Sequence, residues 1–221
     1  MDLAIVDNPY FLFRWIHVLA GLTWIGLLYY FNFVQGAYFL EADGSAKSDA
    51  IQKLVPRALW WFRWGAMLTF LTGLIMLGMG RWTGFGIIAG VVLGTLMFLN
   101  VWLIIWPAQK IVIASAIGVA GGEDPLPEAG PALARAGLAS RTNTLFSFPM
   151  AFFMLSNMHL SSMLKPVGSA STVSLIAVFG LITLLAFNGI KGKMGPMTSV
   201  KGVIHMGIAL TVVLYLLIEL L

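Results

Sequence analysis

Six long runs without a charged residue determine the fold class of this chain. The runs span residues 15–40, 64–80, 82–109, 142–164, 166–190 and 202–218. A helix needs about 20 mostly apolar residues to cross the hydrocarbon core of a bilayer. Only 10% of the residues are charged, whereas soluble domains carry roughly 25%. The sequence therefore predicts an all-α integral membrane protein that contacts the lipid bilayer over most of its length.

The charged residues between these runs predict the topology. Six transmembrane helices are expected at about 9–40, 57–80, 83–118, 140–164, 170–190 and 200–220. Most Lys and Arg residues follow the first, third and fifth helices, and the exceptions are Arg14, Arg81 and Lys165. Basic loops mark the cytoplasmic side, so both termini are predicted outside. The stretch GGEDPLPEAGP predicts a flexible cytoplasmic linker over about 119–139, within one membrane domain spanning residues 1–221.

Two further features of the composition exclude classes of function. The chain contains no cysteine, which excludes disulfides, iron–sulfur clusters, cysteine-based zinc sites and covalent c-type haem within it. The net charge is +4, but the basic residues lie in short loops beside apolar runs. That distribution is typical of membrane orientation, so we expect no nucleic-acid partner.

Two histidines lie inside the predicted membrane helices. His17 is about eight residues into the first helix from the outer side, and His159 is about six residues before the outer end of the fourth. At 1.5 Å per residue, both imidazoles lie roughly 9–12 Å below the outer surface. Ionisable side chains inside a bilayer usually mark functional sites. Because two imidazoles at one depth can hold a b-type haem between helices, we predict His17 and His159 as metal or haem ligands.

The neighbours of these histidines suit a large flat ligand. Gly21 lies one turn below His17, where the lack of a side chain lets a ring approach, and Arg14 lies one turn above, where a guanidinium can pair with a haem propionate. The polar residues that can orient the ring of His159 are Ser156, Asn157, Ser161 and Ser162. The alternative interpretation is that each histidine only forms a hydrogen bond between helices.

The third histidine, His205, lies near the inner end of the sixth helix. It is interpreted as a metal or cofactor ligand with a non-histidine partner, as a proton relay or as a hydrogen-bonding group between helices. If the sixth helix inserts more deeply, His205 competes with His159 as the partner of His17. Copper is less favoured than haem, because the thioethers near His159 suit Cu(I) but are typical of packing; these residues are Met154, Met158 and Met163.

Three segments together resemble a known family. They are RWIHVLAGLTWIGLLYYFNF in the first helix, NVWLIIWPAQK at the end of the third and SRTNTLFSFPMAFFMLSNMH at the start of the fourth. In this order they resemble the urate oxidase N-terminal-domain family, the bacterial membrane urate hydroxylases. The resemblance implies a multi-helix protein of the bacterial inner membrane that is linked to redox chemistry. Full-length members resemble this chain followed by a cytochrome c domain, so we expect a short form whose electron acceptor is a separate cytochrome.

Three functions stay open on these grounds. The first is an inner-membrane redox protein that binds b-type haem through His17 and His159 and passes electrons to a separate periplasmic cytochrome or respiratory partner. The second is a cofactor-free accessory subunit of a larger respiratory or photosynthetic complex. The third is a urate hydroxylase-like oxidoreductase. Whether the chain is an enzyme depends on which of these applies, and each is compatible with a homo-oligomer.

Overall fold

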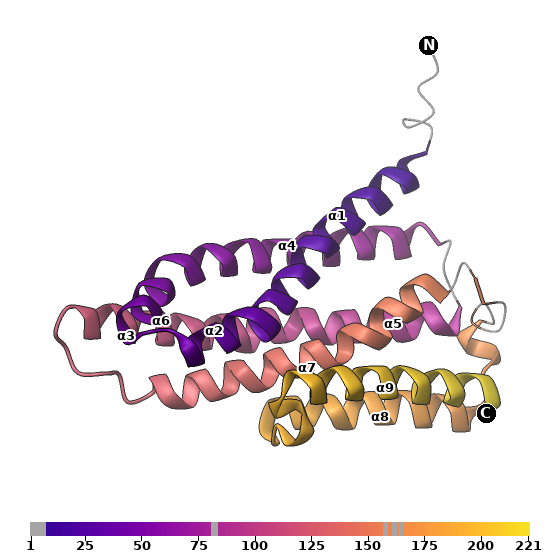
Figure 1. Ribbon diagram of the computed structural model, residues 1–221. Coiled ribbons are helices and arrows are strands. Elements are labelled where there is room, and N and C mark those ends of the chain that lie inside the picture. The colour runs from indigo at the N-terminus through magenta and orange to yellow at the C-terminus, as the bar shows by residue number, and fades with distance from the viewer. Residues whose placement is uncertain (1–7, 81–83, 157–158, 161–162, 164–165) are drawn as a thin grey trace, which may run out of the picture.

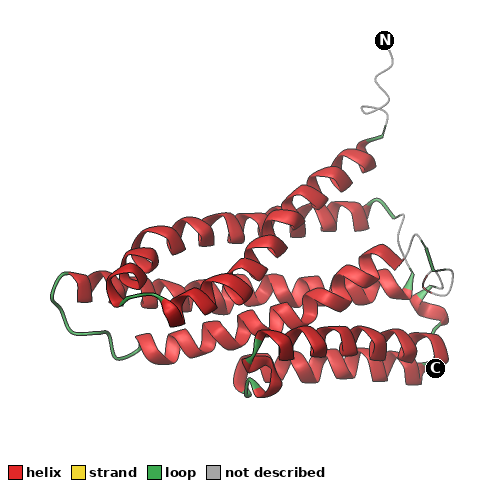
Figure 2. Ribbon diagram, in the orientation of Figure 1, coloured by secondary structure: helices red, strands yellow, loops and turns green. Residues whose placement is uncertain are grey.

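Helices account for every regular element that is described in this protein. The computed structural model describes residues 8–80, 84–156, 159–160, 163 and 166–221. Within these ranges the strand-like pairing is limited to an isolated bridge between Gly84 and Pro166 (Figure 2). The prediction of an all-α fold is confirmed.

Two long continuous helices form the N-terminal part of the bundle. The first comprises α1 (Pro9–Tyr29), the π-helical segment η1 (Tyr30–Gln35) and α2 (Gly36–Glu41). The second comprises α3 (Gly44–Asp49), the π-helical segment η2 (Ala50–Leu54) and α4 (Val55–Gly78). The sequence predicted helices over about 9–40 and 57–80, so the second helix begins earlier than expected.

The remaining elements complete the bundle. The third long helix comprises α5 (Phe85–Leu99), the π-helical segment η3 (Asn100–Ile105) and α6 (Trp106–Ala120). It is followed by α7 (Ala129–Ser156), by the short 3-10 helix η5 (Val167–Ser169) and by α8 (Thr172–Lys191). A second short 3-10 helix, η6 (Gly195–Thr198), leads to α9 (Val200–Leu220). Ser171 and Ser199 cap the last two long helices by accepting backbone N–H groups.

The π-helical segments have local causes in the sequence. Pro56 follows η2 and Pro107 follows η3, each within the first two residues of the next α-helix. Proline has no N–H and its ring clashes with the carbonyl four residues before it, so a widened turn relieves the clash. In η1 the side chain of Asn32 donates to the Leu28 carbonyl at 2.9 Å. These wider turns let long helices continue through positions that otherwise break them.

The loop after α6 is shorter than the linker predicted over about 119–139. Residues 121–128 separate the two helices, because α7 already begins at Ala129. Proline is tolerated in a first helical turn, so Pro131 does not prevent this start. Ala132 and Ala136 are buried against Ala108 of α6, which stabilises the added turns. The predicted extent of the linker was therefore wrong at its C-terminal side.

The helices lie in three groups across the bundle. Figure 1 shows α1 with α4 on one side, α8 with α9 on the other, and α5, α6 and α7 between them. α1 packs mainly against α4, whereas α7 packs against α5, α6 and α9. The first turn of α1 and the C-terminal end of α9 lie toward the same end of the bundle (Figure 1).

Five of the described helices are long and apolar enough to cross a membrane. They run over Pro9–Glu41, Gly44–Gly78, Phe85–Ala120, Thr172–Lys191 and Val200–Leu220. Large apolar side chains are exposed on each of them, as a lipid-contacting surface requires. The fourth predicted helix forms as α7 but is more polar than the others. The count of six and the outward orientation of both termini stay predictions.

The lower hydropathy of α7 comes from polar side chains that the bundle buries. Asn143 is fully buried, accepts a hydrogen bond from Asn100 Nδ2 at 2.8 Å and donates to the Met97 carbonyl at 2.9 Å. Ser140 accepts from Asn32 Nδ2 at 2.8 Å. A bilayer supplies no partners for polar groups, so these bonds must be made within the protein. α7 is therefore the central, polar-bonded helix of the fold.

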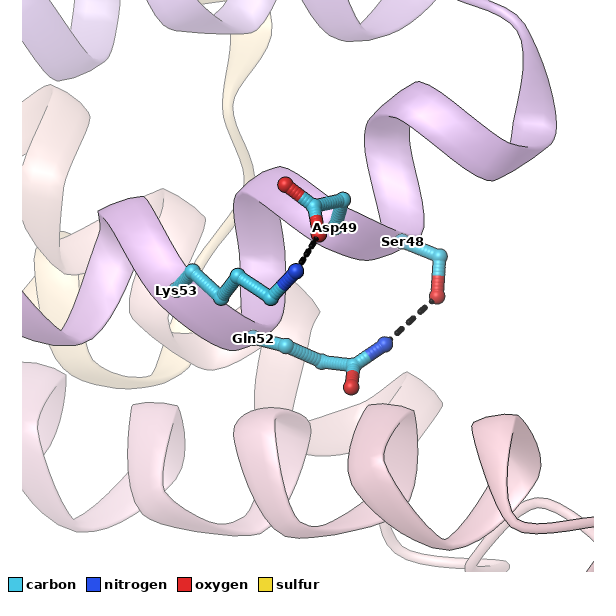
Figure 3. Close-up of polar contacts among 4 residues, drawn as sticks. All are labelled: Ser48, Asp49, Gln52 and Lys53. Carbon is cyan, nitrogen blue, oxygen red and sulfur yellow. Dashed lines mark hydrogen bonds and ion pairs between the residues drawn. The ribbon is translucent and has the colours of Figure 1, made fainter.

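The exposed joint between α3 and η2 is held by local pairs. Gln52 Nε2 donates to Ser48 Oγ at 2.9 Å, and Lys53 forms an ion pair with Asp49 (Figure 3). Both pairs join residues four apart, which are neighbours on one helix face. An exposed ion pair of this kind contributes little, typically about 0.3–0.5 kcal/mol. The joint therefore depends mainly on the continuous helix on either side.

We expect Gly65→Ala to destabilise the contact between α1 and α4. A Cβ at Gly65 would lie 3.2 Å from Trp24 N and 3.3 Å from the Ala20 carbonyl oxygen, and backbone atoms cannot move aside as a side chain can. The cost expected for such overpacking is about 1–3 kcal/mol. Thermal unfolding in detergent measures it. Gly78→Ala is the matched control, because nothing lies within 4 Å of its added Cβ; equal melting temperatures for both variants would contradict this packing.

We expect Asn143→Leu to destabilise the protein by about 1–3 kcal/mol, because it leaves the buried Asn100 amide without its acceptor. Asn188→Leu is the control, since the Asn188 amide bonds to the Lys193 backbone at the exposed end of α8. Chemical unfolding in mixed micelles compares the two variants. A loss of stability confined to Asn188→Leu would show that α7 is not the centre of the fold.

Candidate functional site

A large apolar cavity lies between α1, α4, α5 and α7. Its volume is about 520 Å³, within the range of roughly 300–1,000 Å³ typical of cofactor and ligand sites. Each of the four helices contributes to the wall, among them His17, Gly21 and Trp24 from α1, Gly73 from α4, Gly94 from α5 and Met154 from α7. Two of the predicted site residues, His17 and Gly21, therefore line one space.

A hydrogen bond to α4 orients the imidazole of His17. Its Nδ1 lies 3.1 Å from the hydroxyl oxygen of Thr72. The Thr72 hydroxyl lies 2.6 Å from the Leu68 carbonyl oxygen and 3.0 Å from the Thr69 carbonyl oxygen, and we infer that its single hydrogen is donated to one of these carbonyls. Thr72 therefore accepts from Nδ1–H of His17. The ring is held in the neutral tautomer whose Nε2 keeps its lone pair, which is the form that ligates a metal.

Glycine at position 73 leaves room for this ring. A Cβ there would lie 3.2 Å from His17 Cε1, which is tighter than ordinary van der Waals contact. A Cβ at Gly21 would meet only Thr69 of α4, at 3.9 Å. Gly73 therefore determines the position of the imidazole more directly than Gly21, although both lie on the cavity wall.

Trp24 carries an unpaired donor near the same cavity. The side chain lines the cavity and the residue is only 2% exposed, yet its Nε1–H has no hydrogen-bond partner. A buried donor without an acceptor costs about 1–3 kcal/mol. The Nε1 atom is itself fully buried, so this donor lies behind the cavity wall and not on its surface.

A smaller cavity of about 150 Å³ adjoins the first and contains Arg14. His17, Gly73, Leu77, Val91 and Met154 line both spaces, while Arg14 and Tyr10 line the smaller one. Arg14 is half-buried in the first turns of α1. Arg14, His17 and Gly21 thus lie along one side of α1 beside two adjoining cavities; their role in binding a cofactor stays a prediction.

His159 lies outside the helix in which the sequence expected it. α7 ends at Ser156, and His159 lies in the following turn, where its N–H donates to the Ser156 carbonyl at 2.9 Å. Serine competes with the backbone for hydrogen bonds, which favours helix ends over helix interiors. His159 is exposed and is not among the residues that line either cavity. Its expected depth inside the fourth helix is wrong, whereas its capacity to bind a ligand stays a prediction.

The other predicted ligands are dispersed. His205 is exposed on α9, a helix that packs against α7 and α8. Among the described residues, no group of three or more His, Asp or Glu side chains is placed to hold a metal ion. Met163 is buried, and its side chain would meet a Cβ at Gly86 at 3.0 Å, so its position is one of packing. Asn157, Met158, Ser161 and Ser162 lie outside the described residues.

Comparison with protein families identifies the chain. The model of the urate oxidase N-terminal family matches residues 81–216. The chain belongs to the urate oxidase N-terminal family. Comparisons with curated proteins and with solved structures found no match. Two of the three segments that carried the resemblance lie inside the matched range, whereas the segment of α1 precedes it.

The family match and the cavity overlap only in part. The matched range of the urate oxidase N-terminal family includes α5 and α7, which form one side of the cavity. α1 and α4, with His17 and Thr72, form the other side and lie before the range. Sequence reasoning missed Trp24, Thr72 and Gly73 as parts of the site. Trp24 lies two turns from His17 on the same helix. Thr72 and Gly73 carry no motif, and only the crossing of α1 with α4 brings them to His17.

We expect His17 to carry its proton on Nδ1. The variant His159→Ala/His205→Ala retains His17 as its single histidine, because the chain has three. In 15N-histidine NMR of this variant at neutral pH, one ring nitrogen should show the protonated shift characteristic of the Nδ1–H tautomer. Thr72→Val in the same background removes the acceptor and should allow a mixture of tautomers. A pure Nε2–H tautomer before that substitution would contradict the assigned hydrogen bond.

Proposed function

We propose that this member of the urate oxidase N-terminal family is a bacterial inner-membrane redox protein that binds b-type haem in the cavity beside His17. It would pass electrons from a quinol or another small donor to a separate periplasmic cytochrome or respiratory partner. The observation that carries this proposal is the oriented imidazole of His17 on the wall of a cavity of about 520 Å³.

The shape and lining of the cavity fit a flat, largely apolar group. Glycines from three helices line it, at Gly21 and Gly26 of α1, Gly73 of α4 and Gly94 of α5. Glycine allows a ring to approach the backbone closely. Most other lining side chains are aliphatic or aromatic, which is the usual environment of a non-covalent cofactor. The residues present therefore fit a porphyrin better than a small polar molecule.

The two cavities contain few polar side chains, and these side chains would contact specific parts of a haem. Nε2 of His17 is the nitrogen that would ligate iron, and Thr72 holds the ring in that orientation. Arg14, on the adjoining smaller cavity, supplies positive charge for a propionate. Bound haem would supply one-electron transfer, while the apolar wall excludes water from it.

Family membership favours a second candidate, an oxidoreductase acting on urate. The support is the family's description and the match over residues 81–216. Urate is polar around its whole edge, and two hydroxyls of the cavity are already engaged: Thr69 donates to the Gly65 carbonyl and Tyr29 bonds to Ser147. The cavity therefore supports haem better than urate. Measurement of urate loss in membranes with and without the chain distinguishes the two.

We expect the purified protein to show a Soret band and an α-band in its reduced-minus-oxidised spectrum. His17→Ala should abolish both bands, because it removes the imidazole on the cavity wall. His205→Ala is the matched control and should retain them, because His205 is exposed on α9. Haem content is measured by the pyridine haemochrome method on samples of equal helical content.

Two results would overturn the haem proposal. One is the absence of both bands in wild-type protein prepared from cells supplied with haem precursor, which would favour the cofactor-free accessory subunit. The other is full haem content in His17→Ala together with its loss in His205→Ala. That pattern would move the site to α9.

A further inference from the structure

We infer that Met154 is the second axial ligand of the haem, opposite His17; this assignment rests on the proposed function. The side chains of the larger cavity that offer a neutral nitrogen or sulfur lone pair are His17, Met150 and Met154. The indole of Trp24 is a donor only. His159, which the sequence suggested as the partner, is exposed in the turn after α7. Tyr29 also lines the cavity, but its hydroxyl is hydrogen-bonded to Ser147 at 2.9 Å. The partner available inside the cavity is therefore a thioether.

Met154 is distinguished from the other methionines by its position. Met150 lines only the larger cavity and Met76 lines only the smaller one, whereas Met154 lines both, as His17 does. Met154 and His17 therefore both lie where the two cavities adjoin. The long unbranched side chain can adjust through three torsions, which suits a ligand that must reach an iron atom.

The two side chains also come from opposite walls of the cavity. α1 packs mainly against α4, and α5 packs mainly against α7, so the cavity separates two helix pairs. His17 belongs to the first pair and is hydrogen-bonded to α4 through Thr72. Met154 belongs to the second pair. Axial ligands must approach a planar ring from opposite faces, and one residue from each pair meets that requirement.

The backbone of Met154 is held by a close crossing of α5 and α7. A Cβ at Gly90 would lie 3.4 Å from Met154 N and 3.3 Å from Phe153 Cβ. Phe153 is fully buried and Met154 is half-buried within the last turn of α7. The thioether therefore extends from a fixed backbone position. His/Met ligation raises the haem potential above that of a bis-histidine haem, so the haem accepts an electron from its donor more readily.

The experiment compares the spin state and midpoint potential of the haem in four variants. Met154→Leu keeps the apolar volume but removes the sulfur, so the oxidised haem should change from low spin to high spin in its EPR and visible spectra, with haem content retained. Met154→His should restore the low-spin state with a lower midpoint potential. Met67→Leu on α4 and Met206→Leu on α9 are matched controls, because neither residue lines either cavity, and both should leave the two measurements unchanged.

Three results would overturn the ligation, and they separate it from the haem proposal. If Met154→Leu stays low spin while His159→Ala becomes high spin, the haem has two histidine ligands and the haem proposal still stands. If the wild-type haem is itself high spin, His17 has no axial partner and Met154 is a packing residue. If the wild type has no Soret band, the haem proposal fails and the ligation fails with it.

Discussion

Buried polar bonding along α7 is the constraint on which the rest of the bundle depends. The bilayer offers no hydrogen-bond partners, so a polar helix is stable in this setting only when its neighbours satisfy it. Asn143 does this with Asn100 and the Met97 carbonyl, and Ser140 does it with Asn32. These bonds fix α7 against α5, η3 and η1. The packing of α8 and α9 against α7 then follows from burial of apolar surface.

The same helix connects this polar region with the cavity. The Tyr29 hydroxyl donates to Ser147, whose own hydrogen goes to the Thr144 carbonyl at 2.7 Å, and the ring of Tyr29 lines the cavity. Beyond Ser147, α7 becomes apolar and contributes Met150 and Met154 to the wall. The N-terminal part of α7 thus holds the bundle together by hydrogen bonds. Its C-terminal part leaves space between the two helix pairs.

His17 was interpreted either as a ligand of a metal or haem or as a group that only joins two helices, and its hydrogen bond is relevant to both interpretations. A bond to Thr72 is what a histidine serving only to join two helices would form. The same bond leaves Nε2 as the nitrogen with a free lone pair, and His17 also lines the cavity. The position of His17 on the cavity wall, and not the hydrogen bond, is therefore what supports its interpretation as a ligand.

Sequence reasoning recovered the helices and one side of the site. A long run of uncharged residues predicts a membrane-spanning helix. The positions of most helices therefore followed from the sequence alone. Arg14, His17 and Gly21 were recovered together because they are one turn apart on a single helix. The depth of His159 was wrong because it depended on where α7 ends, and a run of serines near a helix end does not specify that residue.

The sequence by itself determined the all-helical membrane class, the family and the presence of an imidazole within α1. Each of these depends on local composition or on contiguous motifs. Only the tertiary structure decided which groups meet that imidazole. Thr72 and Gly73 reach His17 because α1 crosses α4 closely at Gly65, and Met154 faces the same space because α7 is fixed against α5. Helix crossings depend on side chains far apart in the chain, and no periodicity within one helix encodes them.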